Sequence, residues 1–211
     1  MGATVRGQPP GRAGLMWLAR RGAVATRGAD LLERKLRILL AEEKDYALLE
    51  ERTRGEWARA VGELDVWMLR SALVSGQRAV RLAGDGAQCM VEVTWQLTMG
   101  VRYPTSATCS IPELPASGFT PDNAALREAV PVAHRAVRAG VDHAVASAAH
   151  AAVVAEIATT RRQLRALRER WIPRLQTAHR SLMVTLDDQE HDEHVRLRWA
   201  ADPTRSERVR P

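Results

Sequence analysis

The chain has 211 residues, a length that suits one domain or two small ones. Hydrophobic residues make up 45% of it, but aromatic residues only 4%, which argues against a thick globular core. No apolar run approaches the roughly 20 residues that a membrane-spanning helix requires, and residues 15–19 continue directly into Arg20 and Arg21. We therefore expect a cytoplasmic protein without a transmembrane helix.

Residues 11–83 are predicted to form one long helix. From Leu15 onward, mostly apolar or small residues recur at alternating steps of three and four, and charged residues fill the other positions. This heptad pattern is typical of a helix that packs along one seam. The pattern also passes through Glu43, Tyr46, Glu50, Thr53 and Trp57. The apolar seam residues predicted here are Leu15, Leu18, Leu32, Leu36 and Leu39.

Glycines are expected to weaken the distal part of this helix. No proline occurs between Pro10 and Pro104, so nothing stops the helix, but Gly55, Gly62 and Gly76 each cost up to about 1 kcal/mol relative to Ala. We expect bending or fraying there.

Residues 84–120 interrupt the heptads and are predicted to be irregular and hairpin-like. Residues 89–98 alternate in part and are rich in β-branched side chains, which favours a short strand. Gly100 and Pro104 are expected to end it, and a second extended piece over residues 107–111 could pair with it. Cys89 and Cys109 could then lie opposite each other. Two cysteines are too few for a disulfide framework, so we expect reduced thiols.

Residues 121–200 are predicted to form a second long helix. Pro131 either kinks it or marks its true start, and Pro173 is expected to bend it. Its seam contains Leu164, Leu167 and Trp171, and, after one irregular step at Pro173, Leu175, Leu182 and Leu186.

Two seamed helices hide their apolar stripes most simply by packing antiparallel. The predicted fold class is therefore all-α, a long antiparallel two-helix coiled coil with a short β-hairpin-like middle segment. Residues 1–10 and 201–211 are expected to be flexible tails.

Positive charge is concentrated at the two ends of the sequence. Residues 1–37 contain eight basic and two acidic residues, and residues 161–180 contain seven arginines and one glutamate. Antiparallel packing would bring these stretches together at one tip. They form either a solvated helix face or a docking surface for an acidic partner.

Neither catalytic nor metal chemistry is indicated. His191 and His194, with two acids between them, lack the i, i+4 spacing of a zinc-protease helix and a third ligand, so we interpret residues 191–194 as a solvated acidic face. No glycine-rich loop ending in Lys-Ser/Thr is present, so nucleotide binding by that route is excluded. No cofactor is expected. Four further histidines are interpreted as surface or seam residues: His134, His143, His150 and His179.

Three blocks of sequence resemble the D subunit family of V-type and A-type rotary ATPases and ATP synthases. The first block is Leu15-x-x-Leu18-x-Arg20-Arg21 followed by Arg27-Gly28-Ala29-Asp30-Leu31-Leu32-x-x-Lys35. The second is Met99-Gly100-Val101-Arg102-Tyr103-Pro104. The third is Thr160-Arg161-Arg162-x-x-x-Ala166-Leu167, with Ile172-Pro173-Arg174-Leu175 and Leu186-Asp187-Asp188-Gln189-Glu190. Gly22 departs from the family, which usually has a bulky apolar residue there, and His194-Val195 replace aromatic residues.

The resemblance implies a non-catalytic rotor shaft that couples rotation of a proton- or sodium-conducting membrane ring to ATP synthesis or hydrolysis. Its paired termini would enter the catalytic hexamer of A and B subunits, the F subunit would bind the shaft, and the middle would contact the funnel-shaped C/d-type subunit above the ring. The shaft would then be peripheral to the membrane. The residues predicted to face the hexamer are Arg20, Arg21, Arg27, Lys35, Arg161, Arg162, Arg165 and Arg174.

Two alternatives remain open at this stage. The basic pI of about 10.3 and the arginine-rich helix suit a helical nucleic-acid-binding protein, although Trp and Tyr do not interleave with that helix as a stacking platform would require. An unrelated coiled-coil scaffold is the other alternative.

Overall fold

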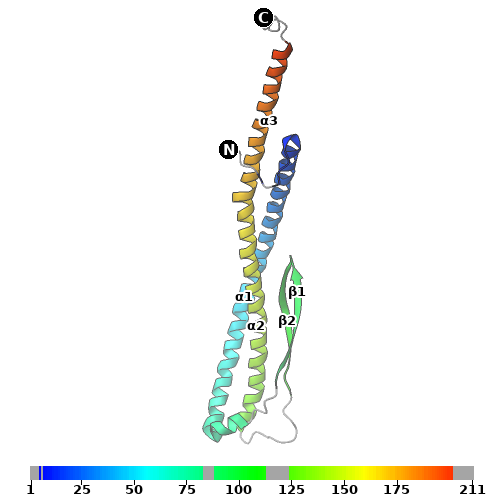
Figure 1. The fold of residues 1–211 in the computed structure, drawn as a ribbon. Coiled ribbons are helices and arrows are strands. Elements are labelled where there is room, and N and C mark those ends of the chain that lie inside the picture. Colours follow the sequence, from blue (N-terminus) through cyan, green and yellow to red (C-terminus); the bar gives the residue numbers. More distant parts are fainter. Residues whose placement is uncertain (1–4, 6, 83–87, 113–123, 202–211) are drawn as a thin grey trace, which may run out of the picture. The chain divides into compact units, whose positions relative to one another are not determined.

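The computed structural model describes residue 5 and residues 7–82, 88–112 and 124–201. The elements in chain order are helix α1 (Gly11–Leu82), strands β1 (Met90–Thr98) and β2 (Val101–Ser110), helix α2 (Ala124–Arg165), a π-helical segment (Ala166–Trp171) and helix α3 (Ile172–Ala201) (Figure 1). The predicted fold class, a helical coiled coil with a short hairpin, is confirmed. No helix in the described part of the chain is both long and apolar enough to span a bilayer.

The chain divides into two compact units. Residues 1–35 and 160–211 form one, called here the terminal unit, and residues 36–159 form the other, called the hairpin unit. Each unit contains a stretch of α1 and a stretch from the C-terminal half of the chain.

In the terminal unit, the beginning of α1 runs antiparallel to α3 (Figure 1). Leu18 and Leu175 are each 1% exposed and pack with Ala25 and Ala178. Val5 is buried against the same cluster. Residues 1–10 were expected to be a flexible tail, and for Val5 this expectation is wrong, because its apolar side chain completes the end of the core.

The irregular step in the predicted seam coincides with the π-helical segment. Strict alternation from Leu167 and Trp171 would reach position 174, but the next seam leucine is Leu175, one residue later. The backbone N–H of Ile172 donates to the carbonyl of Leu167, five residues back, so the wider turn absorbs the extra residue. Pro173 has no N–H to donate, which favours a departure from α geometry here.

In the hairpin unit, residues 36–82 of α1 pair with residues 124–159 of α2, and the hairpin supplies a third component. Leu39 and Val153 are fully buried in a cluster with Ala149 and Ile157 of the helices. Val101 and Tyr103 of β2 complete this cluster. The Tyr46 ring meets the Tyr103 ring edge-on at a centroid distance of 5.3 Å.

The geometry of the hairpin explains why Gly100 and Pro104 occur in the block Met99-Gly100-Val101-Arg102-Tyr103-Pro104. Met99 and Gly100 both have positive φ angles, 50° and 80°, as a two-residue type I′ turn requires. The register shifts between Thr94 and Trp95, where β1 passes Pro104. Proline cannot donate to the ladder, so a bulge accommodates it. The first strand ends at Thr98, before Gly100, as expected. The second strand is longer than the predicted residues 107–111, because β2 begins at Val101 and continues past Pro104 to Ser110.

Pro131 and the glycines of α1 were the positions where helix breaks were expected. Pro131 does not mark the start of the second helix, because α2 begins at Ala124 and continues on both sides of this exposed residue. Gly76, inside α1, has non-helical angles, φ 76° and ψ 161°, so the helix is kinked at one of the glycines where bending was expected. The expected start of the second helix at residue 121 falls outside the described residues.

Candidate functional site

The eight basic residues predicted to face a partner all belong to the terminal unit. Four lie on α1, three on the last turns of α2, and Arg174 on the first turn of α3. All the arginines among them are exposed, whereas Lys35 is half-buried. These arginines are therefore exposed to solvent on both members of the helix pair, α1 and the segment from α2 to α3, in the terminal unit.

Several arginines of this unit have partners within it. The Arg21 guanidinium lies 4.5 Å from the centre of the Trp17 ring, and Arg165 approaches Glu169 at 3.7 Å one turn along the helix. Arg168 bonds across the helix pair to Glu33 at 2.7 Å. These exposed pairs are individually weak, and basic residues outnumber acidic ones in the sequence of the terminal unit.

A second inter-helix ion pair joins the start of α1 to α3. Arg12 donates to Glu190 at 2.6 Å, and this hydrogen bond lowers the pKa of Glu190 and raises that of Arg12. Both side chains are at least half exposed, so the pair adds little to the stability of the fold. Its main effect is to favour one alignment of α1 along α3.

Two open grooves flank the helix pair of the terminal unit, each of about 570 Å³. Leu18, Ala19, Gly22, Leu175, Gln176 and His179 are among the residues that line the first groove. Trp17, Arg21, Val24, Gly28, Leu167 and Trp171 are among those that line the second. A Cβ added at Gly22 would meet no atom within 4 Å. The glycine that departs from the family pattern thus leaves open the space that a bulky side chain would occupy.

The predicted seam residues are buried to different degrees. Leu18, Leu39 and Leu175 are buried. The others are half-buried: Leu15, Leu32, Leu36, Leu164, Leu167, Trp171, Leu182 and Leu186. Two helices alone leave the edges of a seam open to water, which accounts for the intermediate exposure.

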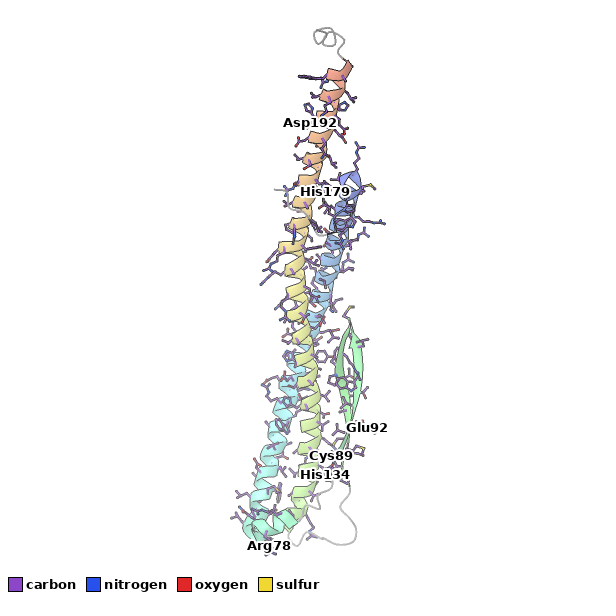
Figure 2. The ribbon with its side chains drawn as sticks, in the orientation of Figure 1. Arg78, Cys89, Glu92, His134, His179 and Asp192 are labelled. Atoms are coloured by element: carbon purple, nitrogen blue, oxygen red, sulfur yellow. The ribbon has the colours of Figure 1, made fainter. Side chains whose placement is uncertain are left out.

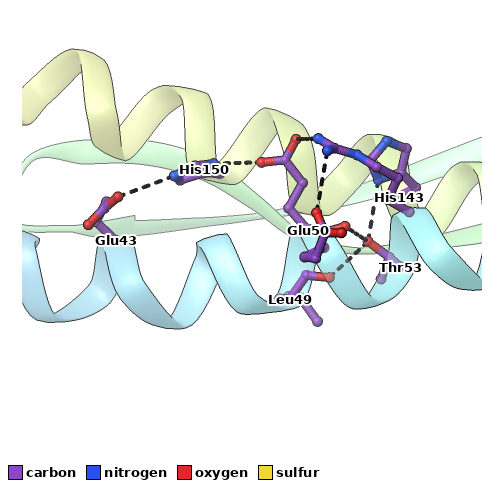
Figure 3. A network of polar contacts seen from close by, with 8 residues as sticks. Glu43, Leu49, Glu50, Thr53, His143 and His150 are labelled. Atoms are coloured by element: carbon purple, nitrogen blue, oxygen red, sulfur yellow. Dashed lines mark hydrogen bonds and ion pairs between the residues drawn. The ribbon is translucent and has the colours of Figure 1, made fainter.

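A polar network inside the hairpin unit was not predicted. His150 of α2 donates from Nδ1 to Glu50 of α1 at 2.6 Å, and its Nε2 lies 3.6 Å from Glu43 (Figure 3). Thr53 lies 3.4 Å from His143, whose ring stacks on Trp57. The hydrogen bond from His150 lowers the pKa of Glu50 against the opposing effect of burial. The sequence contained one sign of this network, namely the polar residues at the otherwise apolar seam positions 43, 50 and 53.

The remaining histidines of the described residues lie on helices α2 and α3. His191, Asp192, Glu193 and His194 are all exposed on α3, where Figure 2 labels Asp192. Among the described residues, no group of three or more His, Cys, Asp or Glu side chains is arranged to hold a metal ion. His134 and His179 are half-buried.

Taken together, the helices and the hairpin define a coiled-coil protein with a basic helix pair at its termini. The sequence matches the family of the ATP synthase D subunit over residues 14–202, nearly the whole chain. The chain belongs to this family, so the predicted resemblance is confirmed. It is accordingly part of a rotary ATPase complex. No curated protein matches the sequence.

Proposed function

We propose that this chain is the central-stalk rotor subunit of a V/A-type ATPase or ATP synthase, and that it couples rotation of the membrane ring to ATP synthesis or hydrolysis in the A/B hexamer. The observation that carries the proposal is the family match over residues 14–202. The chain itself performs no ATP chemistry in this proposal. It is cytoplasmic and attached to the membrane only through the complex.

The packing of each unit supports a role in transmitting torque. A shaft must resist twisting, and a buried seam between two helices resists it because any relative rotation exposes apolar side chains to water. Leu18 with Leu175 in the terminal unit, and Leu39 with Val153 in the hairpin unit, form such seams. Hydrogen bonds from Arg12, Arg168 and His150 to the facing helix favour one alignment of the two helices in each unit.

The charge distribution supports an assignment of ends. We assign the terminal unit to the cavity of the A/B hexamer, where its exposed arginines would meet acidic loops. Within a confined cavity these contacts are stronger than in open solvent, because the effective dielectric constant is lower. The hairpin unit then contacts the funnel-shaped C/d-type subunit, and the F subunit binds along the shaft.

A rotation assay tests the proposal. The hexamer of the cognate A and B subunits is fixed to a surface, and a probe is attached to the full chain at Arg78→Cys, in a background of Cys89→Ser and Cys109→Ser. Arg78 is exposed in the hairpin unit. We expect addition of ATP to drive rotation of the probe in one direction, while the purified chain alone turns over no ATP.

Two results would contradict the proposal. The first is ATP hydrolysis by the assembled complex with a stationary probe, and the second is nucleotide turnover by the chain alone. A control with the probe on the hexamer should show no rotation, which excludes tumbling of the whole complex.

A further inference from the structure

The two cysteines of the chain lie together at the open end of the hairpin, opposite the Met99–Gly100 turn. Cys89 directly precedes β1, and Cys109 lies in β2, paired in register with Val91. Figure 2 labels Cys89 there. Their Sγ atoms are 2.7 Å apart, although the residues are 20 positions apart in sequence. The fold therefore brings together the only two thiols of the sequence.

Little movement separates this pair from a covalent bond. A disulfide has an S–S distance of about 2.05 Å, so the 2.7 Å separation has to close by well under 1 Å. Cys89 is exposed and precedes the first paired residue of β1, Met90. Both cysteines are free thiols in this structure.

The surroundings give the two thiols different roles. Cys89 is exposed and accessible to a reagent, whereas Cys109 is half-buried near Arg138 and Asp142 of α2. The hydrogen bond with Cys89 raises the pKa of Cys109, as does its burial. Its partial burial suits Cys109 to react second, after the exposed Cys89.

We propose that Cys89 and Cys109 are a modification site, a reversible disulfide formed by exchange with a low-molecular-weight disulfide. The Cys89 thiolate attacks one sulfur of the reagent, whose S–S bond breaks and releases one thiolate. Cys109 then loses its proton to solvent and attacks Sγ of Cys89, which expels the second thiolate. Two protein thiols are oxidised, and one reagent disulfide is reduced to two thiols.

The bond closes the hairpin at its open end. A two-stranded hairpin is marginal by itself, and β1 is exposed along nearly its whole length. Only the turn connects the strands covalently within residues 89–109, and the contacts of Val101 and Tyr103 with the helices lie near that turn. A disulfide at the other end produces a closed ring, so the strands separate less often.

Exchange equilibria on the full chain test the proposal. The protein is incubated with mixtures of oxidised and reduced glutathione, quenched with acid, alkylated, digested and analysed by mass spectrometry. We expect a peptide linked through Cys89 and Cys109 to dominate over glutathionylated peptides. Cys109→Ser should accumulate the mixed disulfide at Cys89, and Cys89→Ser should react at least tenfold more slowly.

A matched control moves one thiol by a single residue. Cys109→Ser with Ser110→Cys keeps the composition and nearly the same sequence separation, but neighbouring strand residues point to opposite faces of the sheet. We expect its internal disulfide to form at least tenfold less favourably than that of the natural pair. Equal formation in the control, or mixed disulfides on both natural cysteines, would overturn the proposal.

Amide hydrogen exchange tests the effect on the hairpin. We expect residues 90–110 of the oxidised chain to exchange at least tenfold more slowly than those of the reduced chain. Unchanged exchange rates would show that the bond does not restrain the strands. Both measurements use the chain alone, so their outcome is independent of the rotor function proposed above.

Discussion

The terminal unit and the hairpin unit close a two-helix interface in different ways. The terminal unit packs Leu18 against Leu175 and leaves open grooves on both sides of the helix pair. The hairpin unit covers its Leu39 and Val153 with β2. Because two helices bury only one stripe of each, a two-helix protein needs either a further element or a partner to cover the rest. The hairpin unit contains such an element, and our proposal assigns a partner to the terminal unit.

The largest expected effect concerns the two leucines at the centres of the cores. Leu39→Ala and Leu18→Ala should each lower the free energy of unfolding by about 2–5 kcal/mol, because each leaves a cavity. We expect Leu39→Ala to be the more harmful, since β2 also packs on that cluster. Chemical denaturation followed by circular dichroism measures the loss.

Exposed leucines provide the controls for this comparison. Leu48 in the hairpin unit and Leu31 in the terminal unit are 72% and 64% exposed. Their replacement by Ala should change the free energy of unfolding by less than about 0.5 kcal/mol. Losses as large as those at Leu39 would show that these helix faces are covered.

The second prediction concerns the basic charge that distinguishes the terminal unit. Replacement of Arg161, Arg162 and Arg165 by Gln should weaken hexamer binding roughly tenfold, or about 1.4 kcal/mol, with unchanged helicity. The dependence of binding on salt should decrease as well. Titration of labelled chain into the hexamer at several salt concentrations measures both effects.

The matched control removes equal charge from the hairpin unit. Arg59, Arg70 and Arg78 are exposed on α1 there, and their joint replacement by Gln should alter binding less than about twofold. If the two triple variants bind equally, the electrostatic part of our proposal is wrong.

The third prediction concerns the polar network of the hairpin unit. Because the folded-state pKa of Glu50 is lowered, chiefly by its hydrogen bond from His150, its carboxylate stabilises the fold above the unfolded-state pKa. That contribution is lost as pH falls through the lower, folded-state pKa. Glu50→Gln should therefore cost about 1 kcal/mol at pH 7 and nothing once Glu50 is protonated in both states. Denaturation of both chains at a series of pH values from pH 7 downward tests this.

Glu51 is the control for this pH dependence. It is the adjacent residue, its side chain is 75% exposed, and it lies 3.4 Å from Arg54. Glu51→Gln should change stability by only a few tenths of a kcal/mol, because exposed pairs contribute little. A pH profile of Glu50→Gln parallel to that of the unmodified chain would mean that the His150 bond adds no stability.

The smallest effects are expected at helical glycines, one in each unit. A Cβ at Gly28 or at Gly62 would meet no atom within 4 Å. Replacement by Ala should raise the free energy of unfolding by about 0.5–1 kcal/mol at each, because Ala loses less backbone entropy in a helix. Thermal melting should show two similar gains, and a loss at either position would indicate that α1 is not a regular helix there.

Helices and seams could be predicted because heptad periodicity is a local signal. The hairpin was predicted only in part, because its second strand was expected over residues 107–111, whereas β2 begins at Val101. Pro104 can lie within β2 because the register shifts where it passes Trp95, and such a shift depends on the pairing of two strands, which a pattern along one strand does not reveal. The bond between Glu50 and His150, 100 positions apart, was missed for the same reason. Charge clustering at Arg161 and Arg162 was visible, but the grooves beside Gly22 and Gly28 depend on how the helices pair.

The π-helical segment bears on where the chain tolerates insertion and deletion. Each residue of an α-helix turns about 100° around the axis, so a one-residue deletion within α3 would turn every later side chain away from the seam. A deletion within residues 166–171 would instead remove the surplus residue and return Leu175 to regular spacing. At this segment, therefore, the chain can lose one residue while the seam residues before and after it still point toward the partner helix.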